Sequence, residues 1–324
     1  MRYRRLGNSG VKVSEIALGS WLTFGGYVEA KEAREAMKAA FAAGVNFFDT
    51  ADVYAGGEAE KSLGEFLASV PRKDVFVATK CFFPTDEGPN DRGLSRKHVT
   101  ESLAASLDGL GLTYVDLYQC HRYDPETPLE EVVETMTNLV RRGQILYWGV
   151  SMWTATQITR ACGLARAMNG VAPISNQPAY SLLDRSIEAE VVPVSAREGL
   201  SQVVFSPLAQ GVLTGKYAGG RVPDGSRASR KGPAGQFIRR FMVPDKLEAV
   251  ERLRPIAARM GITLSQLALS WCLRLGNVAS VVMGASTAAQ VKENVAASGV
   301  DLTPSMLEEI EEALVGPREE DEGE

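Results

Sequence analysis

Short apolar runs rich in β-branched residues alternate with longer segments of helical periodicity along almost the entire chain. Such alternation is typical of α/β proteins, in which helices connect neighbouring strands. Eight runs are predicted as strands, and they span 16–19, 46–49, 75–80, 115–120, 145–151, 174–177, 203–206 and 278–284. Eight strands with intervening helices in 324 residues favour one closed (β/α)8 barrel, a TIM barrel, over two doubly wound domains.

Four of the predicted helices begin with a capping box, in which a Thr hydroxyl and a Glu or Gln side chain satisfy free amides reciprocally. These boxes are Thr127-Pro-Leu-Glu130, Thr154-Ala-Thr-Gln157, Thr263-Leu-Ser-Gln266 and Thr287-Ala-Ala-Gln290. Pro128 also suits a first helical position. After Ser95, apolar residues at 99, 103, 107 and 110 form one stripe. We therefore expect amphipathic helices that lie on a sheet.

Further segments extend this barrel beyond its minimum. Residues 2–14 read as an N-terminal β-hairpin around Asn8-Ser-Gly10, which we expect to close the barrel floor. A long loop over 207–244 and a final helix over about 303–314 follow later in the chain. We predict one barrel domain over 1–316 with extra C-terminal helices, and an acidic tail at 317–324.

Composition narrows the class of protein. The chain is 45% hydrophobic and 23% charged, which excludes a disordered or fibrous protein, and its net charge of −5 gives no reason to expect nucleic acid. No apolar run approaches the roughly 18 residues of a membrane span, and the basic start lacks the apolar core of a signal peptide. We expect a cytoplasmic protein without membrane insertion, whose four separated cysteines are reduced and hold no metal.

The charge is unevenly distributed along the sequence. Residues 216–240 hold seven bases and one acid, whereas residues 318–324 hold one base and five acids. We expect the cations of 216–240 to gather over the barrel mouth, where they favour a phosphate-bearing ligand.

Candidate catalytic residues follow successive strands at their carboxyl ends, where barrel active sites lie. The second strand ends in Asp49, five residues before Tyr54, the third ends in Lys80, and His121 follows the fourth. Each residue alone also has a structural explanation, as a turn start, a half-buried aromatic, a rim lysine or a core histidine. Their coincidence favours a catalytic site. The other histidine, His98, is expected in solvent.

These four side chains suit proton transfer to a carbonyl oxygen. The Lys80 ammonium would lower the pKa of the Tyr54 phenol, and Asp49 would hold Lys80 protonated. A neutral His121 would donate a hydrogen bond to the entering oxygen. Tyr54 would then act as general acid while hydride arrives at carbon, which predicts carbonyl reduction.

Asp49-Thr-Ala-Asp-Val-Tyr54, Lys80 and Gln119-Cys-His121 resemble the Asp, Tyr, Lys and His tetrad of the aldo-keto reductase superfamily. The resemblance covers nearly the whole chain and is strongest to the branch with the potassium-channel β subunits and their bacterial aldehyde and ketone reductase relatives. The motifs that carry it are Trp21-Leu-Thr-Phe-Gly-Gly26, Gly93-Leu-Ser-Arg-Lys-His98, Tyr147-Trp-Gly-Val-Ser151, Ser206-Pro-Leu-Ala209, Gly215-Lys-Tyr217, Ser226-Arg-Ala-Ser229 and Gly284-Ala-Ser286.

The resemblance implies a (β/α)8 fold that binds NADP(H) across the barrel mouth. It implies Ser151 and Gln177 at the nicotinamide carboxamide and Phe205 stacked on the ring. It also implies cofactor contacts at Ser20, Trp21 and Asp49, a pyrophosphate lining of Ser206, Pro207, Leu208, Ala209, Gly211 and Lys216, and a 2′-phosphate and adenine site of Arg227, Gly284, Ser286, Gln290, Glu293 and Asn294.

Local sequence features bear on this cofactor site. Residues 284–287 open a helix whose free amides favour phosphate, although helix capping is an alternative role for Gln290. No G-x-G-x-x-G motif is present. The segment from Gly211 to Lys216 is one residue shorter than a P-loop, and Tyr217 replaces its Ser or Thr.

The sequence thus predicts an NADP(H)-dependent oxidoreductase of the EC 1.1.1 type that reduces small aldehydes or ketones to alcohols. The alternative is a redox-sensing, NADP-binding regulatory subunit with little turnover. By the resemblance, channel-type relatives carry Arg in place of Met152, and Met152 cannot hydrogen-bond the cofactor, which weakens the argument for very tight cofactor retention. They also carry Asn in place of His121, and an inactivating peptide would need an extension before Met1. These last two points favour the enzyme.

Substrate selection would come from Trp21, Tyr27, Phe82, Phe83 and the loops after the fourth and seventh strands. The partner is then a small-molecule carbonyl compound. The sequence leaves its identity open, and the oligomeric state too, a homo-oligomer included.

Overall fold

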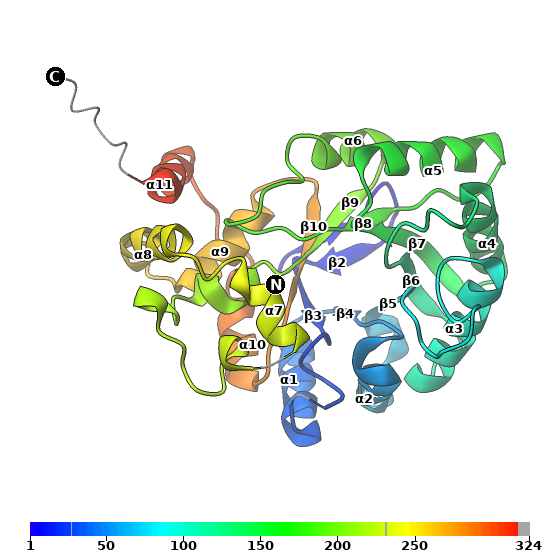
Figure 1. Cartoon of the computed structure of the whole chain (residues 1–324), viewed down its shortest axis with the longest axis horizontal. Coiled ribbons are helices and arrows are strands. Elements are labelled where there is room, and N and C mark those ends of the chain that lie inside the picture. The colour runs from blue at the N-terminus through cyan, green and yellow to red at the C-terminus, as the bar shows by residue number, and fades with distance from the viewer. Residues whose placement is uncertain (27, 231, 317–324) are drawn as a thin grey trace.

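The barrel predicted from the sequence is present in the structure, a computed structural model that describes residues 1–26, 28–230 and 232–316. Eight parallel strands close in the order β10-β3-β4-β5-β6-β7-β8-β9 (Figure 1). Their bounds are β3 Ile16–Gly19, β4 Phe47–Asp49, β5 Phe76–Cys81, β6 Val115–Cys120, β7 Ile145–Ser151, β8 Ser175–Gln177, β9 Ser201–Phe205 and β10 Val278–Met283. All eight predicted strands are confirmed, with ends that differ by one or two residues at most.

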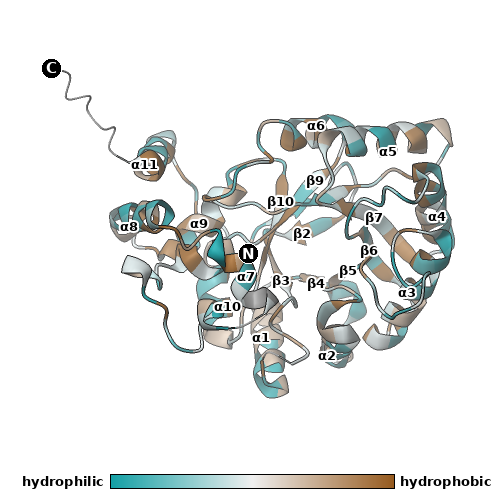
Figure 2. Ribbon diagram, in the orientation of Figure 1, coloured by the Kyte–Doolittle hydropathy of each residue, from teal (hydrophilic) through white to brown (hydrophobic). Residues whose placement is uncertain are grey.

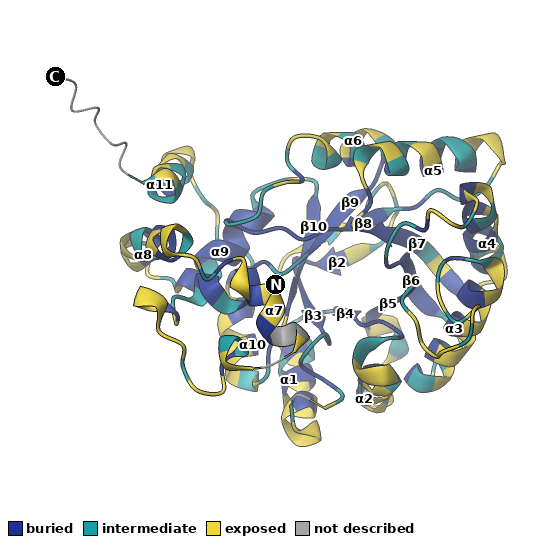
Figure 3. Ribbon diagram, viewed as in Figure 1, coloured by how far each residue is buried: buried dark blue, intermediate teal, exposed yellow. Residues whose placement is uncertain are grey.

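Helices surround the barrel and carry both hydrophobic and hydrophilic residues, as amphipathic connections require (Figure 2). They are α1 Ala30–Ala42, α2 Glu58–Leu67, α3 Arg96–Leu110, α4 Leu129–Arg141, α5 Ala155–Ala167, α6 Val191–Glu198, α7 Pro233–Arg239, α8 Pro244–Arg259, α9 Leu264–Leu273, α10 Ala288–Val295 and α11 Pro304–Val315. The barrel strands are mostly buried, and the helices expose their outer faces except α9, which is buried along nearly its whole length (Figure 3). The predicted final helix is present as α11, and Thr303 caps its start.

Two of the four predicted capping boxes are complete, at Thr154 and Thr263. The prediction at Thr127 is wrong, because its hydroxyl donates to the Asp124 carboxylate at 2.8 Å and α4 begins after Pro128 instead. A hydroxyl that donates to a charged carboxylate makes a stronger hydrogen bond than one that accepts from a backbone amide. The Thr127 hydroxyl therefore binds Asp124 and does not cap the helix. At α10, Thr287 caps the helix, but the other half of the predicted box is not made.

The N-terminal hairpin is present, with strands β1 Tyr3–Arg5 and β2 Lys12–Ser14. It lies against the amino ends of the barrel strands, where the Gly7 amide donates to Ser201 Oγ at 2.8 Å. Leu6 and Val13 join one apolar cluster with Phe47, Phe76, Ala78, Leu117 and Val203. The hairpin therefore closes the barrel floor, as predicted.

Helix α3 has a second buried stripe that the apolar pattern does not reveal. His98, Ser102 and Ser106, spaced four residues apart, are all buried. The α3 helix packs against α2, and Ser102 Oγ donates to Asp52 at 2.8 Å. The expectation that His98 lies in solvent is therefore wrong, because this small polar face is covered. All four cysteines, Cys81, Cys120, Cys162 and Cys272, are free and buried, as expected.

The long loop predicted after β9 contains short 3-10 turns and α7. The turns are η3 Ala209–Thr214, η4 Ala218–Gly220 and η5 Arg227–Ser229, while η1 Tyr54–Gly57 and η2 Arg72–Asp74 occur earlier in the chain. Within the described residues, no single helix is long and apolar enough to cross a membrane, and α8 and α9 pass that test only as a pair bent by 91°. The predicted acidic tail at 317–324 lies outside the described residues.

Candidate active site

The twofold alternation of strand side chains positions the candidate site. Phe47 and Phe76 belong to the apolar cluster at the barrel floor. Residues two or four positions further along the same strand face the same way, which brings Asp49 and Lys80 into the upper barrel interior. The floor is thus apolar, and the polar groups collect at the carboxyl end of the strands.

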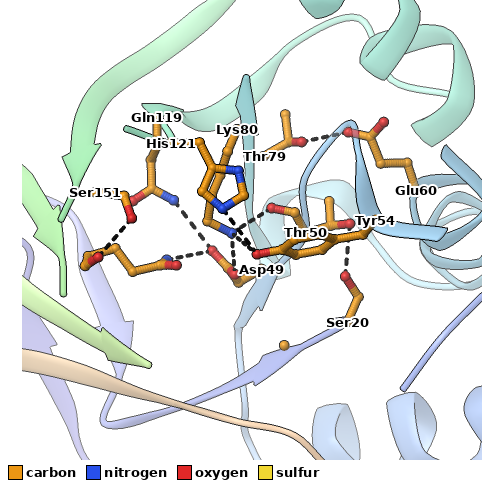
Figure 4. Close-up of polar contacts among 12 residues, drawn as sticks. Ser20, Asp49, Thr50, Tyr54, Glu60, Thr79, Lys80, Gln119, His121 and Ser151 are labelled. Carbon is orange, nitrogen blue, oxygen red and sulfur yellow. Dashed lines mark hydrogen bonds and ion pairs between the residues drawn. The ribbon is translucent and has the colours of Figure 1, made fainter. Parts of the chain in front are cut away.

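Lys80 is held by two short interactions in the barrel interior (Figure 4). Its Nζ lies 2.6 Å from Asp49 Oδ2 and donates to the Thr50 carbonyl oxygen at 2.7 Å. The Lys80 side chain is fully buried. Burial lowers the pKa of the Lys80 ammonium, but the Asp49 and Tyr54 groups outweigh burial and leave that pKa above its ordinary value. Lys80 is therefore a charged group at neutral pH.

Tyr54 extends toward Lys80 from the loop that follows β4. Its hydroxyl lies 3.5 Å from Lys80 Nζ and 3.5 Å from His121 Nε2. Both distances are long for hydrogen bonds, as is common in catalytic sites without substrate. Tyr54 begins the turn η1, in which Ala55 has a left-handed φ of 51°. The four predicted tetrad residues thus converge at one point.

The pKa of Tyr54 differs from the sequence-based expectation. Burial raises the pKa of its phenol, and the nearby Lys80 charge lowers it by less, so the resulting pKa is above 10.0. The expected effect of Lys80 is present, but desolvation outweighs it. A raised pKa keeps the hydroxyl protonated, which is the form that a general acid needs.

His121 is neutral at physiological pH. Burial, followed by the positive charges of Lys80 and Arg122, holds its pKa well below 6.5. Its Nδ1 is buried and lacks a hydrogen-bond partner among the described residues, whereas Nε2 faces Tyr54. A neutral ring with its proton on Nε2 can donate to a substrate oxygen, as the sequence predicted.

Gln177 and Ser151, predicted at the nicotinamide, lie beside Asp49. Gln177 Nε2 donates to Asp49 Oδ1 at 2.8 Å, and Ser151 Oγ donates to the Gln177 carbonyl at 2.8 Å. Ser20 Oγ donates to Thr50 Oγ1 at 2.9 Å on the opposite side of the site. These side chains form one polar rim around the carboxylate.

The predicted pyrophosphate loop has an unusual backbone. Ser206, Ala209 and Gln210 follow β9 with φ of 57°, 46° and 61°, all in the left-handed region that residues with a Cβ rarely adopt. Gly211 continues this geometry with φ of 99°, and a Cβ there would lie 3.3 Å from Lys216 Nζ. Strained backbone of this kind is typical of ligand-binding loops.

Arg227 lies over the barrel mouth. Its Nη1 donates to Gln210 Oε1, and its guanidinium carbon lies 5.7 Å from the centre of the Trp21 ring. The Trp21 ring in turn packs edge-on against Phe237 of α7. No described carboxylate forms an ion pair with Arg227, so its charge is available to an anion.

The predicted adenine-side residues lie around α10, apart from the tetrad. Ser286 directs its amide at 2.8 Å and its hydroxyl at 3.0 Å to Gln290 Oε1. A capping box would require the Gln290 side chain to accept from the amide of the N-cap residue, Thr287. It accepts from the amide of Ser286 instead, so the capping-box alternative does not explain its position. Asn294 is buried, whereas Glu293 and Gly284 are exposed. Phe205 is the last residue of β9, and Pro207 and Leu208 belong to the loop that follows it. Tyr27 lies outside the described residues.

Sequence reasoning missed several residues that shape the site. Gln119 Nε2 approaches Asp49 Oδ1 at 3.4 Å. The sequence holds a signal for this position, because Gln119 is a polar residue two positions after Leu117, which faces the barrel interior. Asp52 and Glu60 are buried carboxyl groups behind the tetrad, with pKa values raised by burial, to about 7 for Asp52. In the described part of the chain, no group of three His, Cys, Asp or Glu residues is arranged to hold a metal.

Comparisons with known proteins agree with this geometry. The model of the aldo/keto reductase family matches residues 15–315. A protein of Oryza sativa subsp. japonica named "Probable voltage-gated potassium channel subunit beta" is 44% identical over 316 residues, covering 96% of each chain. A protein of the same name from Arabidopsis thaliana is 43% identical over 319 residues, covering 97% of each chain. The resemblance drawn from the sequence motifs is confirmed.

Proposed function

Because the chain belongs to the aldo/keto reductase family and is thus an oxidoreductase, we propose that it reduces small aldehydes or ketones to alcohols with NADPH. The observation that carries the proposal is the approach of Tyr54 to both Lys80 and His121, at 3.5 Å each. A carbonyl oxygen seated between the Tyr54 hydroxyl and His121 Nε2 receives two hydrogen bonds. Both donors are neutral and protonated at physiological pH.

Each tetrad residue has a distinct part in the proposed reaction. His121 orients the carbonyl oxygen, and Tyr54 transfers its proton to that oxygen as negative charge develops there. Lys80 stabilises the phenolate left on Tyr54, and Asp49 keeps Lys80 charged and in place. The hydride for the carbonyl carbon comes from the nicotinamide when the cofactor is bound.

The residues around the barrel mouth fit NADP(H) chemically. The Arg227 guanidinium suits the 2′-phosphate, since a fork of N–H donors matches phosphate oxygens. The left-handed backbone at Gln210 and Gly211, together with Lys216, suits the pyrophosphate, because consecutive amides in such turns form anion sites. Gln177 and Ser151 suit the carboxamide. Asp49 is then shared between the cofactor side and the proton-transfer side.

Substrate turnover tests the proposal directly. Purified protein is mixed with NADPH and methylglyoxal or 4-nitrobenzaldehyde, and loss of nicotinamide absorbance is followed. Replacement Tyr54→Phe removes the general acid and should lower kcat by about 100-fold or more, with NADPH binding retained. Tyr3→Phe, which changes an exposed tyrosine of the hairpin, should leave kcat unchanged. Equal activity of Tyr54→Phe and wild type would overturn the proposed role of Tyr54.

The names of the two relatives support a second candidate, a regulatory subunit. By the resemblance, such a subunit would sense the redox state of its bound nucleotide. Such a protein binds NADPH tightly but shows negligible turnover with every carbonyl compound tried. The same assay therefore separates the two functions, if NADPH binding is measured alongside turnover by quenching of intrinsic fluorescence.

A further inference from the structure

Arg122 is a cation beside the candidate catalytic groups that neither the tetrad nor the predicted cofactor site uses. It directly follows His121, and its Nη1 donates to the His121 carbonyl oxygen at 2.5 Å. Its charge opposes the burial-driven rise in the pKa of Tyr54 and adds to the lowering of the pKa of His121, so it acts on both groups that face the proposed carbonyl oxygen. No described carboxylate forms an ion pair with Arg122. Its charge therefore has no carboxylate partner among the described residues, although it lies beside Tyr54 and His121.

The surroundings of Arg122 are apolar on one side. The guanidinium carbon lies 5.3 Å from the centre of the Phe83 ring, and the same ring packs edge-on against His121 with centres 4.9 Å apart. Phe83 packs in turn against Phe82. A guanidinium carries five N–H donors in one plane, and it can stack on an aromatic ring while these donors still point outward.

The neighbouring acid does not neutralise this charge. Asp124, two residues further on, accepts hydrogen bonds from the Leu94 amide at 2.7 Å, the Glu126 amide at 2.9 Å and the Thr127 hydroxyl at 2.8 Å. Its oxygens are thus engaged in fixing the loop after β6. A partly buried cation with free donors, held beside an aromatic wall, is a ready site for an anionic group.

We propose that Arg122 is a substrate-binding residue that selects carbonyl compounds carrying an anionic group, a carboxylate or a phosphate, with an apolar body packed against Phe83. This inference rests on the proposed function and specifies its substrate class. Tyr54 and His121 bind the carbonyl oxygen of such a substrate, and Arg122 binds its anionic end.

Matched substrates test the inference. The compounds are 4-formylbenzoate, its neutral methyl ester and 4-formylphenyl phosphate, which share one aromatic aldehyde. In the wild-type protein, kcat/KM for at least one anionic aldehyde should exceed that for the ester by about 10- to 100-fold, the usual contribution of a charge-assisted hydrogen bond. A higher value for the phosphate or for the carboxylate identifies the preferred anion. Similar values for all three compounds would overturn the inference.

Variants assign any such preference to Arg122. Arg122→Gln should reduce the ratio of anionic to neutral kcat/KM to near one, and Arg122→Lys should give an intermediate ratio. The ratio is the informative quantity, because a change in the acidity of Tyr54 affects both aldehydes alike. Arg160→Gln removes an exposed cation on α5 and should leave the ratio at its wild-type value. An unchanged ratio in Arg122→Gln contradicts the inference.

Inhibition of the wild-type protein gives a test that needs no variant. Benzoate should inhibit reduction of the methyl ester at least about tenfold more strongly than neutral benzamide does, and equal inhibition would contradict the anion site. Failure of the proposed function has a different signature, since no aldehyde would then be reduced in a Tyr54-dependent way. Reduction that depends on Tyr54 but ignores substrate charge would remove only the role of Arg122.

Discussion

The Lys80–Asp49 ion pair allows a quantitative test of buried charge in this barrel. The Lys80 side chain is 0% exposed and that of Asp49 is 4% exposed, with 2.6 Å between Nζ and Oδ2. Removing one partner of a buried pair leaves an uncompensated charge and costs about 3–5 kcal/mol. Lys80→Met and Asp49→Asn should therefore each lower the free energy of unfolding by about that amount.

The double variant contains neither charge, so its loss of unfolding free energy should be much smaller than the sum of the losses in the two single variants. We expect a coupling energy of about 3 kcal/mol between the two positions. For 324 residues, an unfolding entropy of about 2.1 cal/mol/K per residue converts each kcal/mol into roughly 1.5 °C of Tm. Each single variant should melt about 4–7 °C below wild type, and the double variant about 7 °C below it, rather than the ~12 °C expected from additivity.

Calorimetric melts at neutral pH provide the measurement. The matched control is the exposed pair Lys38 and Glu35 on α1, separated by 3.0 Å with side chains 54% and 55% exposed. Lys38→Met, Glu35→Gln and their combination should each change Tm by about 1 °C or less, because exposed pairs contribute little. Additive losses at Lys80 and Asp49 would refute the reasoning, since they would mean that neither charge depends on the other.

Two further predictions concern pH and the cofactor. The pKa of Asp52 is raised by burial from 3.8 to about 7, so the folded state keeps a proton that the unfolded state loses. This contribution to stability is full below about pH 4 and is lost as pH rises through about 7. The Tm of Asp52→Asn relative to that of wild type should therefore rise progressively from pH 5 to pH 8. A Tm difference that stays constant with pH would contradict the raised pKa of Asp52. Arg227→Ala should raise KM for NADPH about 10- to 100-fold and that for NADH less than about threefold, and equal effects in steady-state kinetics would remove Arg227 from the 2′-phosphate site.

Much of the fold could be predicted because its determinants are local and periodic. The strands are continuous apolar runs, and the position of Asp49 and Lys80 at strand ends follows from chain order alone. The complete capping boxes at Thr154 and Thr263 are equally local. The box at Thr127 failed because the carboxylate of Asp124, three residues earlier, captures its hydroxyl.

The electrostatics of the site could not be predicted from the sequence. The pKa of Tyr54 depends on how deeply its hydroxyl is buried, and the loop that decides this is fixed only in three dimensions. The burial of His98 depends likewise on how α3 packs in the folded chain, which the sequence alone does not show. Arg122 appears in the sequence as one more surface cation, and its lack of a partner among the described acids emerges only when Asp124 is seen bound elsewhere.

The sealed floor has a consequence for proton traffic during turnover. Beneath Lys80 the barrel is filled by Phe47, Phe76 and Leu117, with the hairpin below them, so water does not reach the lysine along the barrel axis from that side. In the proposed reaction, substrate entry, alcohol release and the return of a proton to Tyr54 would then share the mouth. Reprotonation of Tyr54 would thereby be tied to departure of the alcohol, because both use the same opening.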